Sequence, residues 1–333
     1  MPELPEVETV RRGLESLIVD KTIKNITHDN DKSFPNDPVL VSEFAIRSEI
    51  IKIRRRAKVL LVDLSSSYTL MTHLKMTGQL VYVKRKQEIT SSKLQNTNKS
   101  EIINSKLEND KNEKGLGFDA SNLDVSNSDE VRFGAGHPND SLINKLPDKS
   151  TRVTITFTDN SNLYFNDQRK FGWMRLIPTD LVTQEPFMLK VGPEPLEPEF
   201  TDKIFLSRVR RRANTSIKAA VLDQTVLAGV GNIYADESLW GAKIHPATLV
   251  KNVSDTKLKK LHQEIIYVLN LSIEKGGSTD RNYVNAEGKK GSYIEYAKVF
   301  RRENLPCPRC QTTVQKIRVA GRGTHICPNC QSK

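Results

Sequence analysis

The sequence lacks any long hydrophobic run, and it has very few cysteines. No stretch approaches the roughly 18 to 20 uninterrupted apolar residues that a membrane span requires. The start, MPELPEVE, has neither the basic region nor the apolar region of a signal peptide. All four cysteines fall within the last 27 of the 333 residues. We therefore expect a cytoplasmic protein with no membrane partner, whose cysteines bind a metal rather than form disulfides.

Acidic residues are too few to balance the basic ones. The chain has 51 Lys plus Arg against 40 Asp plus Glu, a formal net charge of +11. Such an excess indicates a partner that carries phosphates, although an acidic membrane surface or a need for solubility would also fit it. The length allows two domains of ordinary size, each with its own core.

The first half of the chain alternates between one helical pattern and several strand patterns. Pro5 suits the first turn of a helix, and apolar residues follow at three- and four-residue steps (Val7, Val10, Leu14 and Leu17), although Gly13 weakens the pattern. Residues rich in β-branched and apolar side chains predict strands at 50–53, 59–62, 79–83, 153–157 and 163–165. We expect a β-sandwich with a helix at its start.

Two segments divide the chain. Residues 84–150 are rich in Asn, Ser, Asp and Lys, and we predict a disordered insertion there because such a composition buries too little apolar surface. The proline-rich run at 191–198 is extended and marks a linker. After it, helices are predicted at about 201–212, 216–224, 232–240 and 255–275.

The cysteines form two Cys-x-x-Cys pairs at the end of the chain. Cys307 and Cys310 are followed, after 16 residues, by Cys327 and Cys330. This spacing is typical of two knuckles that close a tetrahedral site around one structural Zn²⁺. The zinc could simply fold the tail, but the intervening hairpin is basic (Lys316, Arg318, Arg322 and His325), so we expect it to contact DNA.

The N-terminus allows two interpretations. Glu3 and Glu6 could merely be acids placed favourably at a helix start. However, Met1 is normally removed before a small second residue, and removal would expose the secondary amine of Pro2, with a pKa of about 8. Attack of such an amine on a sugar C1′ gives a cationic iminium, and the two neighbouring carboxyl groups could supply the acid and base that this chemistry needs.

Seven segments, together with the cysteine pairs, resemble the bacterial formamidopyrimidine-DNA glycosylases. The segments are MPELPEVETVRRGL (1–14), RRAKVLLV (55–62), HLKMTG (73–78), NDQRKFG (166–172), VGPEPL (191–196), IKAAVLDQTVLAGVGNIYADESLWGAKIHP (217–246) and GGSTDRNYVNAEGKKGS (276–292). They occur in the family's order, and the resemblance extends over the whole chain apart from the insertion. One departure is Ser150, where the family commonly has a histidine that touches DNA.

The resemblance implies a bifunctional glycosylase and AP lyase that acts on oxidised purines in double-stranded DNA. It implies that Pro2 is the Schiff-base nucleophile, that Glu3 donates and shuttles protons at the sugar, and that Glu6 assists near the ribose. Lys58 would be a second proton donor, for β-elimination, and would hold phosphate, although a lysine in such a strand is more often solvated. Arg322 would serve δ-elimination and clamp a phosphate.

Further residues are expected to contact DNA. To reach a base inside the duplex, the enzyme must extrude the nucleotide. Met76, Arg169 and Phe171 match the family's inserted wedge, although Met76 and Phe171 could instead be core residues. Asn232 resembles a phosphate-gripping residue, or is a plain helix N-cap. His73, Arg212 and Lys218 are expected to add backbone contacts, and the segment from 276 to 291 resembles a loop that closes over the flipped base.

The predicted fold is therefore α+β: an N-terminal helix plus a two-sheet β-sandwich, then a helix–two-turn–helix domain and a C-terminal zinc-finger β-hairpin. The expected boundaries are 2–190 for the catalytic sandwich with its insertion at about 84–150, 191–198 for the linker, 199–292 for the helical domain and 293–333 for the finger. We expect a monomer associated with the nucleoid through DNA binding.

Two other functions fit parts of the sequence. The related glycosylase branch specific for oxidised pyrimidines usually opens with Pro-Glu-Gly-Pro-Glu, so Leu4 argues against it. A non-catalytic zinc-ribbon regulator would bind DNA without cleaving it, but it would have no need for a free Pro2 amine with two carboxyl groups beside it.

Overall fold

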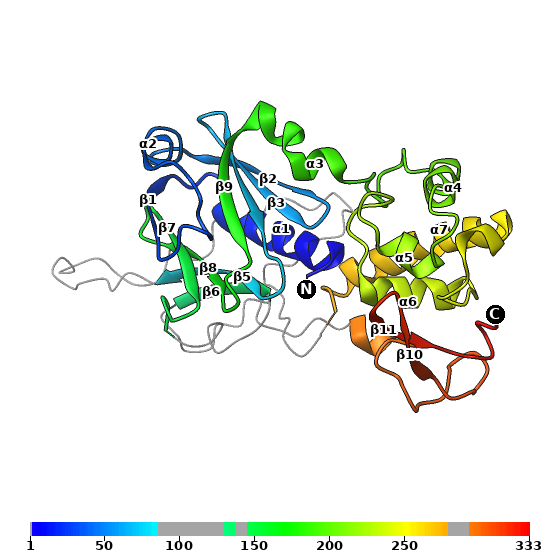
Figure 1. The fold of residues 1–333 in the computed structure, drawn as a ribbon. Helices are drawn as coiled ribbons and strands as arrows, with labels where there is room; N and C mark the ends of the chain where they lie inside the picture. The colour runs from blue at the N-terminus through cyan, green and yellow to red at the C-terminus, as the bar shows by residue number, and fades with distance from the viewer. Residues whose placement is uncertain (1, 86–129, 137–144, 279–292) are drawn as a thin grey trace, which may run out of the picture.

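The computed structural model describes residues 2–85, 130–136, 145–278 and 293–333. The N-terminal half is a β-sandwich with one long helix, and the C-terminal half is a group of helices with a β-hairpin below it (Figure 1). Within the described ranges, no helix is both long and apolar enough to cross a membrane.

Two antiparallel sheets form the sandwich. One has the strand order β1-β7-β8-β5-β6, and the other has the order β2-β3-β4-β9. The strands are β1 (Ile23–His28), β2 (Ile50–Arg56), β3 (Val59–Leu64), β4 (Tyr68–His73), β5 (Gly78–Arg85), β6 (Glu130–Gly136), β7 (Thr151–Phe157), β8 (Asn162–Asp167) and β9 (Trp173–Pro178). Short helical segments accompany the sheets at α2 (Pro38–Leu40), η1 (Val41–Ala45), η4 (Thr179–Gln184) and α3 (Pro186–Lys190).

Helix α1 (Leu4–Ile18) packs into the core that both sheets share. Val10, Leu14 and Ile18 are buried there among side chains of β2, β3, β5 and β7. The predicted apolar face is correct except at its end, where Ile18 is fully buried and Leu17 only partly. Burial of this face fixes the direction of α1, and so fixes where the chain start lies.

The predicted insertion at 84–150 is too long. Residues 130–136 form β6, which pairs with β5 in the register Tyr82↔Phe133, and residues 145–150 are described as well. Phe133 is buried in the sandwich core, so this strand is anchored by an apolar side chain as well as by its pairing with β5. The remainder of the predicted insertion, 86–129 and 137–144, lies outside the described residues.

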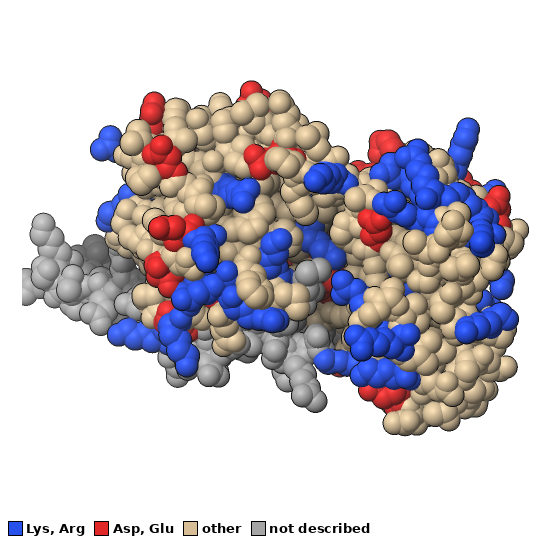
Figure 2. Space-filling view, viewed as in Figure 1, with Lys and Arg blue, Asp and Glu red and all other residues tan. Residues whose placement is uncertain are grey.

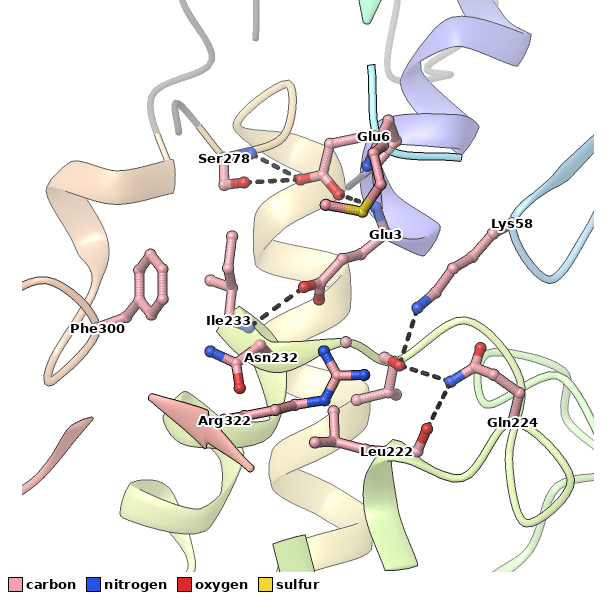
Figure 3. A pocket seen from close by; sticks show the side chains of 14 residues that line it. Glu3, Glu6, Lys58, Leu222, Gln224, Asn232, Ile233, Ser278, Phe300 and Arg322 are labelled. Atoms are coloured by element: carbon pink, nitrogen blue, oxygen red, sulfur yellow. Dashed lines mark hydrogen bonds between the residues drawn. The ribbon is translucent and has the colours of Figure 1, made fainter. Parts of the chain in front are cut away.

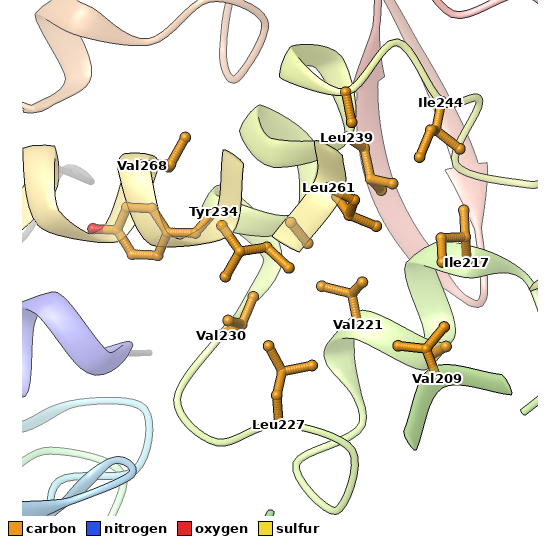
Figure 4. Close-up of a cluster of buried hydrophobic side chains, with 14 of the residues drawn as sticks. Val209, Ile217, Val221, Leu227, Val230, Tyr234, Leu239, Ile244, Leu261 and Val268 are labelled. Atoms are coloured by element: carbon orange, nitrogen blue, oxygen red, sulfur yellow. The ribbon is translucent and has the colours of Figure 1, made fainter. Parts of the chain in front are cut away.

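The second half is built around helix α6 (Asn232–Gly241), seven of whose residues are buried. Around it stand α4 (Asp202–Arg210), α5 (Ile217–Leu222), η5 (Val250–Asn252), α7 (Asp255–Glu274) and α8 (Tyr293–Tyr296). Their apolar side chains meet in one cluster (Figure 4). The predicted helices are confirmed to within one or two residues. Three of them start where predicted because the side chains of Thr201, Ser216 and Ser254 accept hydrogen bonds from the backbone of the first turn.

A partly buried ion-pair cluster joins the two halves through the linker. The Glu194 carboxylate accepts hydrogen bonds from Arg55 at 2.7 Å, from Arg56 at 2.8 Å and from the Ala57 backbone at 2.5 Å. Burial alone would raise the pKa of Glu194, but Arg55 and the other donors hold it below its ordinary value. The turn between β2 and β3 is thereby held against the start of the helical domain.

Candidate active site

A pocket of about 370 Å³ opens where the two halves and the hairpin meet (Figure 3). Its size is within the range of small-molecule sites. It brings together seven of the residues expected from the sequence, namely Pro2, Glu3, Glu6, Lys58, Met76, Asn232 and Arg322. The other lining residues are Leu222, Gln224, Val230, Gly231, Ile233, Ser278 and Phe300.

The chain start is docked on the loop before α6. The Leu4 backbone N–H donates to Gly229 O at 3.0 Å, and the Leu4 side chain packs so closely on Gly229 that a Cβ there would overlap it. The Glu3 backbone N–H donates to the Glu6 carboxylate at 2.8 Å. The backbone N–H groups of Glu3 and Leu4 are therefore both held in place, and Pro2, just before them, faces the pocket.

Glu3 is a buried carboxyl group with one unsatisfied oxygen. Its side chain lies against α6, where Oε1 accepts from the Ile233 N–H at 3.3 Å. Among the described residues, Oε2 has no hydrogen-bond partner. Burial raises the pKa of Glu3 to about 7, although Lys58 lowers it. A carboxyl group with this pKa can both give and take a proton near neutral pH.

Lys58 is buried, which contradicts the interpretation of a solvated strand residue. It follows Ala57, which has a positive φ of 53° in the β2–β3 turn, and its Nζ donates to Val230 O at 3.1 Å. Burial lowers the pKa of Lys58, whereas the carboxylates of Glu3 and Glu6 raise it. The ammonium thus lies opposite the two acids, across the same pocket (Figure 3).

Arg322 reaches the pocket from the hairpin of β10 (Gln315–Val319) and β11 (Arg322–Ile326). The next residue is held by the helical domain, because Gly323 O accepts from Asn232 Nδ2 at 3.0 Å and from Lys218 Nζ at 3.3 Å. Asn232 is the first residue of α6 and Gly231 is its N-cap, so Asn232 is not a plain N-cap. The hairpin is therefore tied to the start of α6, where Arg322 is exposed to a ligand.

Two expected DNA contacts are buried instead. Lys218 is fully buried, and its Nζ donates to Asp236 at 2.6 Å and to Thr324 at 2.8 Å. His73 packs between Trp173 and Phe187, and burial lowers its pKa to about 3. A buried ion-paired ammonium and a neutral imidazole have no free charge for a phosphate in this structure. Arg212 lies nearer the surface, paired with Asp223 at 2.8 Å.

The predicted wedge residues lie on two exposed turns, outside the core. Met76 is in the β4–β5 turn, whereas Arg169 and Phe171 are in the β8–β9 connection, and Phe171 is 55% exposed. The buried carboxylate of Asp167 joins these turns: it accepts from the Thr77 hydroxyl and from the backbone N–H groups of residues 169, 171 and 172. Core packing is therefore the wrong interpretation of Met76 and Phe171.

The four cysteines gather at the far end of the hairpin. Their Sγ atoms all lie within 4.8 Å of one another, with Cys310 Sγ 3.4 Å from Cys327 Sγ and Cys307 Sγ 3.9 Å from Cys330 Sγ. Tetrahedral Zn–S bonds of about 2.3 Å would place sulfurs about 3.8 Å apart. The cluster therefore fits one structural zinc, and the prediction of a zinc finger is confirmed.

Sequence reasoning missed three residues at the pocket. Gln224 donates to Val230 O at 2.8 Å and Phe300 lines one wall. Tyr234, behind the pocket, is fully buried and donates to Glu6. Gln224 and Tyr234 lie within a segment that had been singled out, but only their contacts distinguish them from their neighbours, and no pattern marks Phe300. Residues 279–292, which include most of the expected closing loop, lie outside the described part of the chain.

Family models match almost the whole chain. Residues 1–174 match the formamidopyrimidine-DNA glycosylase N-terminal domain, and residues 191–283 match the H2TH domain of the same family. Residues 304–333 match a zinc finger found in FPG and IleRS. These matches agree with the predicted order of sandwich, helical domain and finger.

Individual relatives cover the full length. A formamidopyrimidine-DNA glycosylase of Ligilactobacillus salivarius is 36% identical over 331 residues, with 99% of each chain covered. A Lactococcus lactis FPG mutant, solved with a Fapy-dG containing DNA, is 32% identical with a TM-score of 0.75, and both chains are fully covered. MutM in complex with carbocyclic 8-oxo-G containing DNA is 32% identical with a TM-score of 0.74, again with full coverage. This chain belongs to the formamidopyrimidine-DNA glycosylase family of DNA repair enzymes, as its sequence predicted.

Proposed function

We propose that this chain excises 8-oxoguanine and formamidopyrimidines from double-stranded DNA and then cuts the strand by β,δ-elimination. The observation that carries the proposal is the convergence of Pro2, Glu3, Lys58 and Arg322 on one pocket. These residues come from the chain start, the β2–β3 turn and the terminal hairpin, so local structure alone does not bring them together. The two relatives solved with Fapy-dG and 8-oxo-G containing DNA support this substrate class.

The first step joins Pro2 to the sugar. Once Met1 is removed, the neutral Pro2 nitrogen attacks C1′, the bond from C1′ to the base breaks, and the base leaves with the electron pair and takes up the proton that the Pro2 nitrogen loses. Glu3, whose pKa of about 7 leaves much of it protonated at neutral pH, gives its proton to O4′ as the C1′–O4′ bond opens. The product is a cationic iminium between Pro2 and C1′.

Strand cleavage follows from the electron demand of the iminium. The Glu3 carboxylate takes a proton from C2′, and the phosphate on C3′ leaves; loss of a proton from C4′ then expels the phosphate on C5′ in the second elimination. Lys58 donates a proton during β-elimination, while Arg322 holds phosphate and serves δ-elimination. Water finally hydrolyses the iminium and restores the amine.

The surface supports binding to a duplex with an extruded nucleotide. Lysine and arginine side chains gather on both sides of the hollow between the two halves (Figure 2). Met76, Arg169 and Phe171 stand on exposed turns, where they can fill the space that the extruded base leaves. We therefore expect DNA affinity to fall steeply with salt concentration.

Borohydride trapping tests the nucleophile. The purified protein is incubated with a duplex that carries one 8-oxoguanine opposite cytosine, reduced, and analysed by mass spectrometry. We expect an adduct on Pro2, greatly weakened in Pro2→Gly, whose primary amine gives an imine that can lose its proton and become neutral. Pro5→Ala is the matched control, because Pro5 lies in the same segment without lining the pocket. Tight DNA binding by the wild type without an adduct would instead support a non-catalytic DNA-binding protein.

A second comparison tests the substrate. We expect faster release of 8-oxoguanine than of thymine glycol from otherwise identical duplexes, and preference for the pyrimidine would contradict the proposal. Leu4 is fully buried against Gly229, so it cannot read the base by direct contact. Residues other than Leu4 must therefore make that choice.

A further inference from the structure

Tyr234 is buried directly behind the pocket, at a junction of three segments. It lies on α6, its side chain is fully buried, and its hydroxyl donates to Glu6 Oε1 at 2.5 Å. The Ser272 hydroxyl on α7 lies 2.6 Å from the same phenol oxygen. A tyrosine has one proton to donate. Because that proton points to Glu6, Ser272 is the donor to the phenol oxygen, and the chain of bonds runs from Ser272 through Tyr234 to Glu6.

The two carboxylate oxygens of Glu6 accept hydrogen bonds from different halves of the protein. Oε1 accepts from Tyr234 and from both the backbone N–H and the hydroxyl of Ser278, at 2.9 and 3.0 Å. Oε2 accepts from the Glu3 backbone N–H at 2.8 Å. The helical domain therefore holds one oxygen, while the other holds the peptide that directly follows Pro2.

The hydroxyl of Tyr234 is a permanent donor. Burial raises its pKa well above the ordinary value, and the nearby carboxyl groups of Glu6 and Glu3 raise it further. Tyr234 thus stays protonated at any pH at which the protein works. Without it, Oε1 would lose the tyrosine donor and keep the two donors of Ser278, and the carboxylate could turn toward Ser278 and away from Glu3.

We propose that Tyr234 is a positioning residue for the Pro2 amine, acting through Glu6. Its hydroxyl keeps the Glu6 carboxylate in the orientation that holds the Glu3 amide, and the Glu3 amide sets where Pro2 stands. The inference rests on the proposed role of Pro2 as nucleophile. Tyr234 itself does not line the pocket and makes no contact with the reacting atoms.

The first test compares attack with binding. On a duplex with an abasic site, Tyr234→Phe should form the borohydride-trapped adduct about 10- to 100-fold more slowly, the cost of a displacement approaching 1 Å. Its Kd for the same DNA should stay within about twofold of wild type. The matched control is Tyr293→Phe: this tyrosine is also buried and its ring lies 5.4 Å from that of Tyr234, whereas the tyrosine hydrogen bond to Glu6 described above comes from Tyr234. Trapping by the control should be unchanged.

A double-mutant cycle tests the route through Glu6 even if Tyr234→Phe loses some stability. If Tyr234 acts through Glu6, adding Tyr234→Phe to Glu6→Gln slows trapping by no more than about twofold. Multiplied losses would overturn the inference, as would wild-type trapping by Tyr234→Phe. Absence of a wild-type adduct at Pro2 would instead overturn the proposed function, so the two failures can be told apart.

Discussion

Gly231 provides the sharpest test of how closely Glu3 must be positioned. An added Cβ at Gly231 would lie 2.6 Å from Glu3 Oε2, and closer still to Cδ and Oε1. The backbone of Gly231 has φ −130° and ψ −163°, an extended conformation that alanine adopts without strain. The three atoms nearest to the added Cβ all belong to the Glu3 carboxyl group, so Gly231→Ala acts first on that group.

The expected magnitude follows from the required displacement. To regain an ordinary contact of 3.4 Å, the carboxyl group must retreat by about 1 Å, and a misplacement of about 1 Å can cost about 100-fold in rate. This equals about 2.7 kcal/mol of transition-state stabilisation. The displaced group is the end of a flexible side chain, so we expect the stability loss to be about 1 kcal/mol, at the low end for overpacking.

Gly241→Ala is the matched control. A Cβ there would also meet a glutamate carboxyl group, with Glu264 Cδ at 2.6 Å, but at the far end of α6 and away from the pocket. The assay is single-turnover release of 8-oxoguanine, with DNA affinity and melting temperature measured on the same samples. We expect similar small losses of stability but a large rate loss for Gly231→Ala only. Equal rates in the two variants would refute the reasoning.

Three further predictions concern protons, metal and the wedge turns. Glu3 must be protonated to act, and its pKa is about 7, whereas the Pro2 amine must be neutral, and its pKa is about 8. The excision rate should therefore rise up to pH 7, stay nearly level to pH 8 and fall above it. A rate that still rises from pH 8 to 9 would contradict this. Chelation of the zinc should release the hairpin and Arg322, so that proteolysis cuts the C-terminal residues while the sandwich stays folded, and added Zn²⁺ should restore strand cleavage. Asp167→Asn should weaken the hydrogen bonds that join the turns carrying Met76 and Phe171, and so slow base extrusion, which 2-aminopurine fluorescence can follow. Adding Thr77→Val to this variant should then slow extrusion little further. Independent effects of the two changes would argue against a joint role of Asp167 and Thr77 in holding the turns together.

Elements with a local cause could be predicted from the sequence. Ser254 starts α7 because its hydroxyl caps the helix, and the apolar spacing after it places the buried face. The cysteine spacing likewise sufficed for the zinc site, since four thiols on two short turns have one common ligand geometry. Strand β6 was missed because a composition averaged over 84–150 hides Phe133.

The site residues divide in the same way. Pro2, Glu3, Lys58 and Arg322 could be named from motifs, because their segments resemble a known family. Their burial could not be predicted, because it depends on partners distant in the chain. Lys58 lies in a strand pattern that usually exposes lysine, yet its partner is Val230 O, 172 residues away. For Lys218 the sequence led to the opposite expectation: we expected it to contact DNA, and it is instead paired with Asp236 inside the protein.

The order of the segments, the zinc ligands and the identity of the chemical groups could be predicted from the sequence alone, because each of these follows from residue type and spacing. Which groups share a pocket, and in which protonation state, depends instead on how the elements pack in three dimensions. The pKa of Glu3 reaches about 7 because α6 and the chain start enclose it, and Tyr234 reaches Glu6 because α6 packs against the chain start. Burial and charge proximity are properties of packed elements, and no local pattern records them.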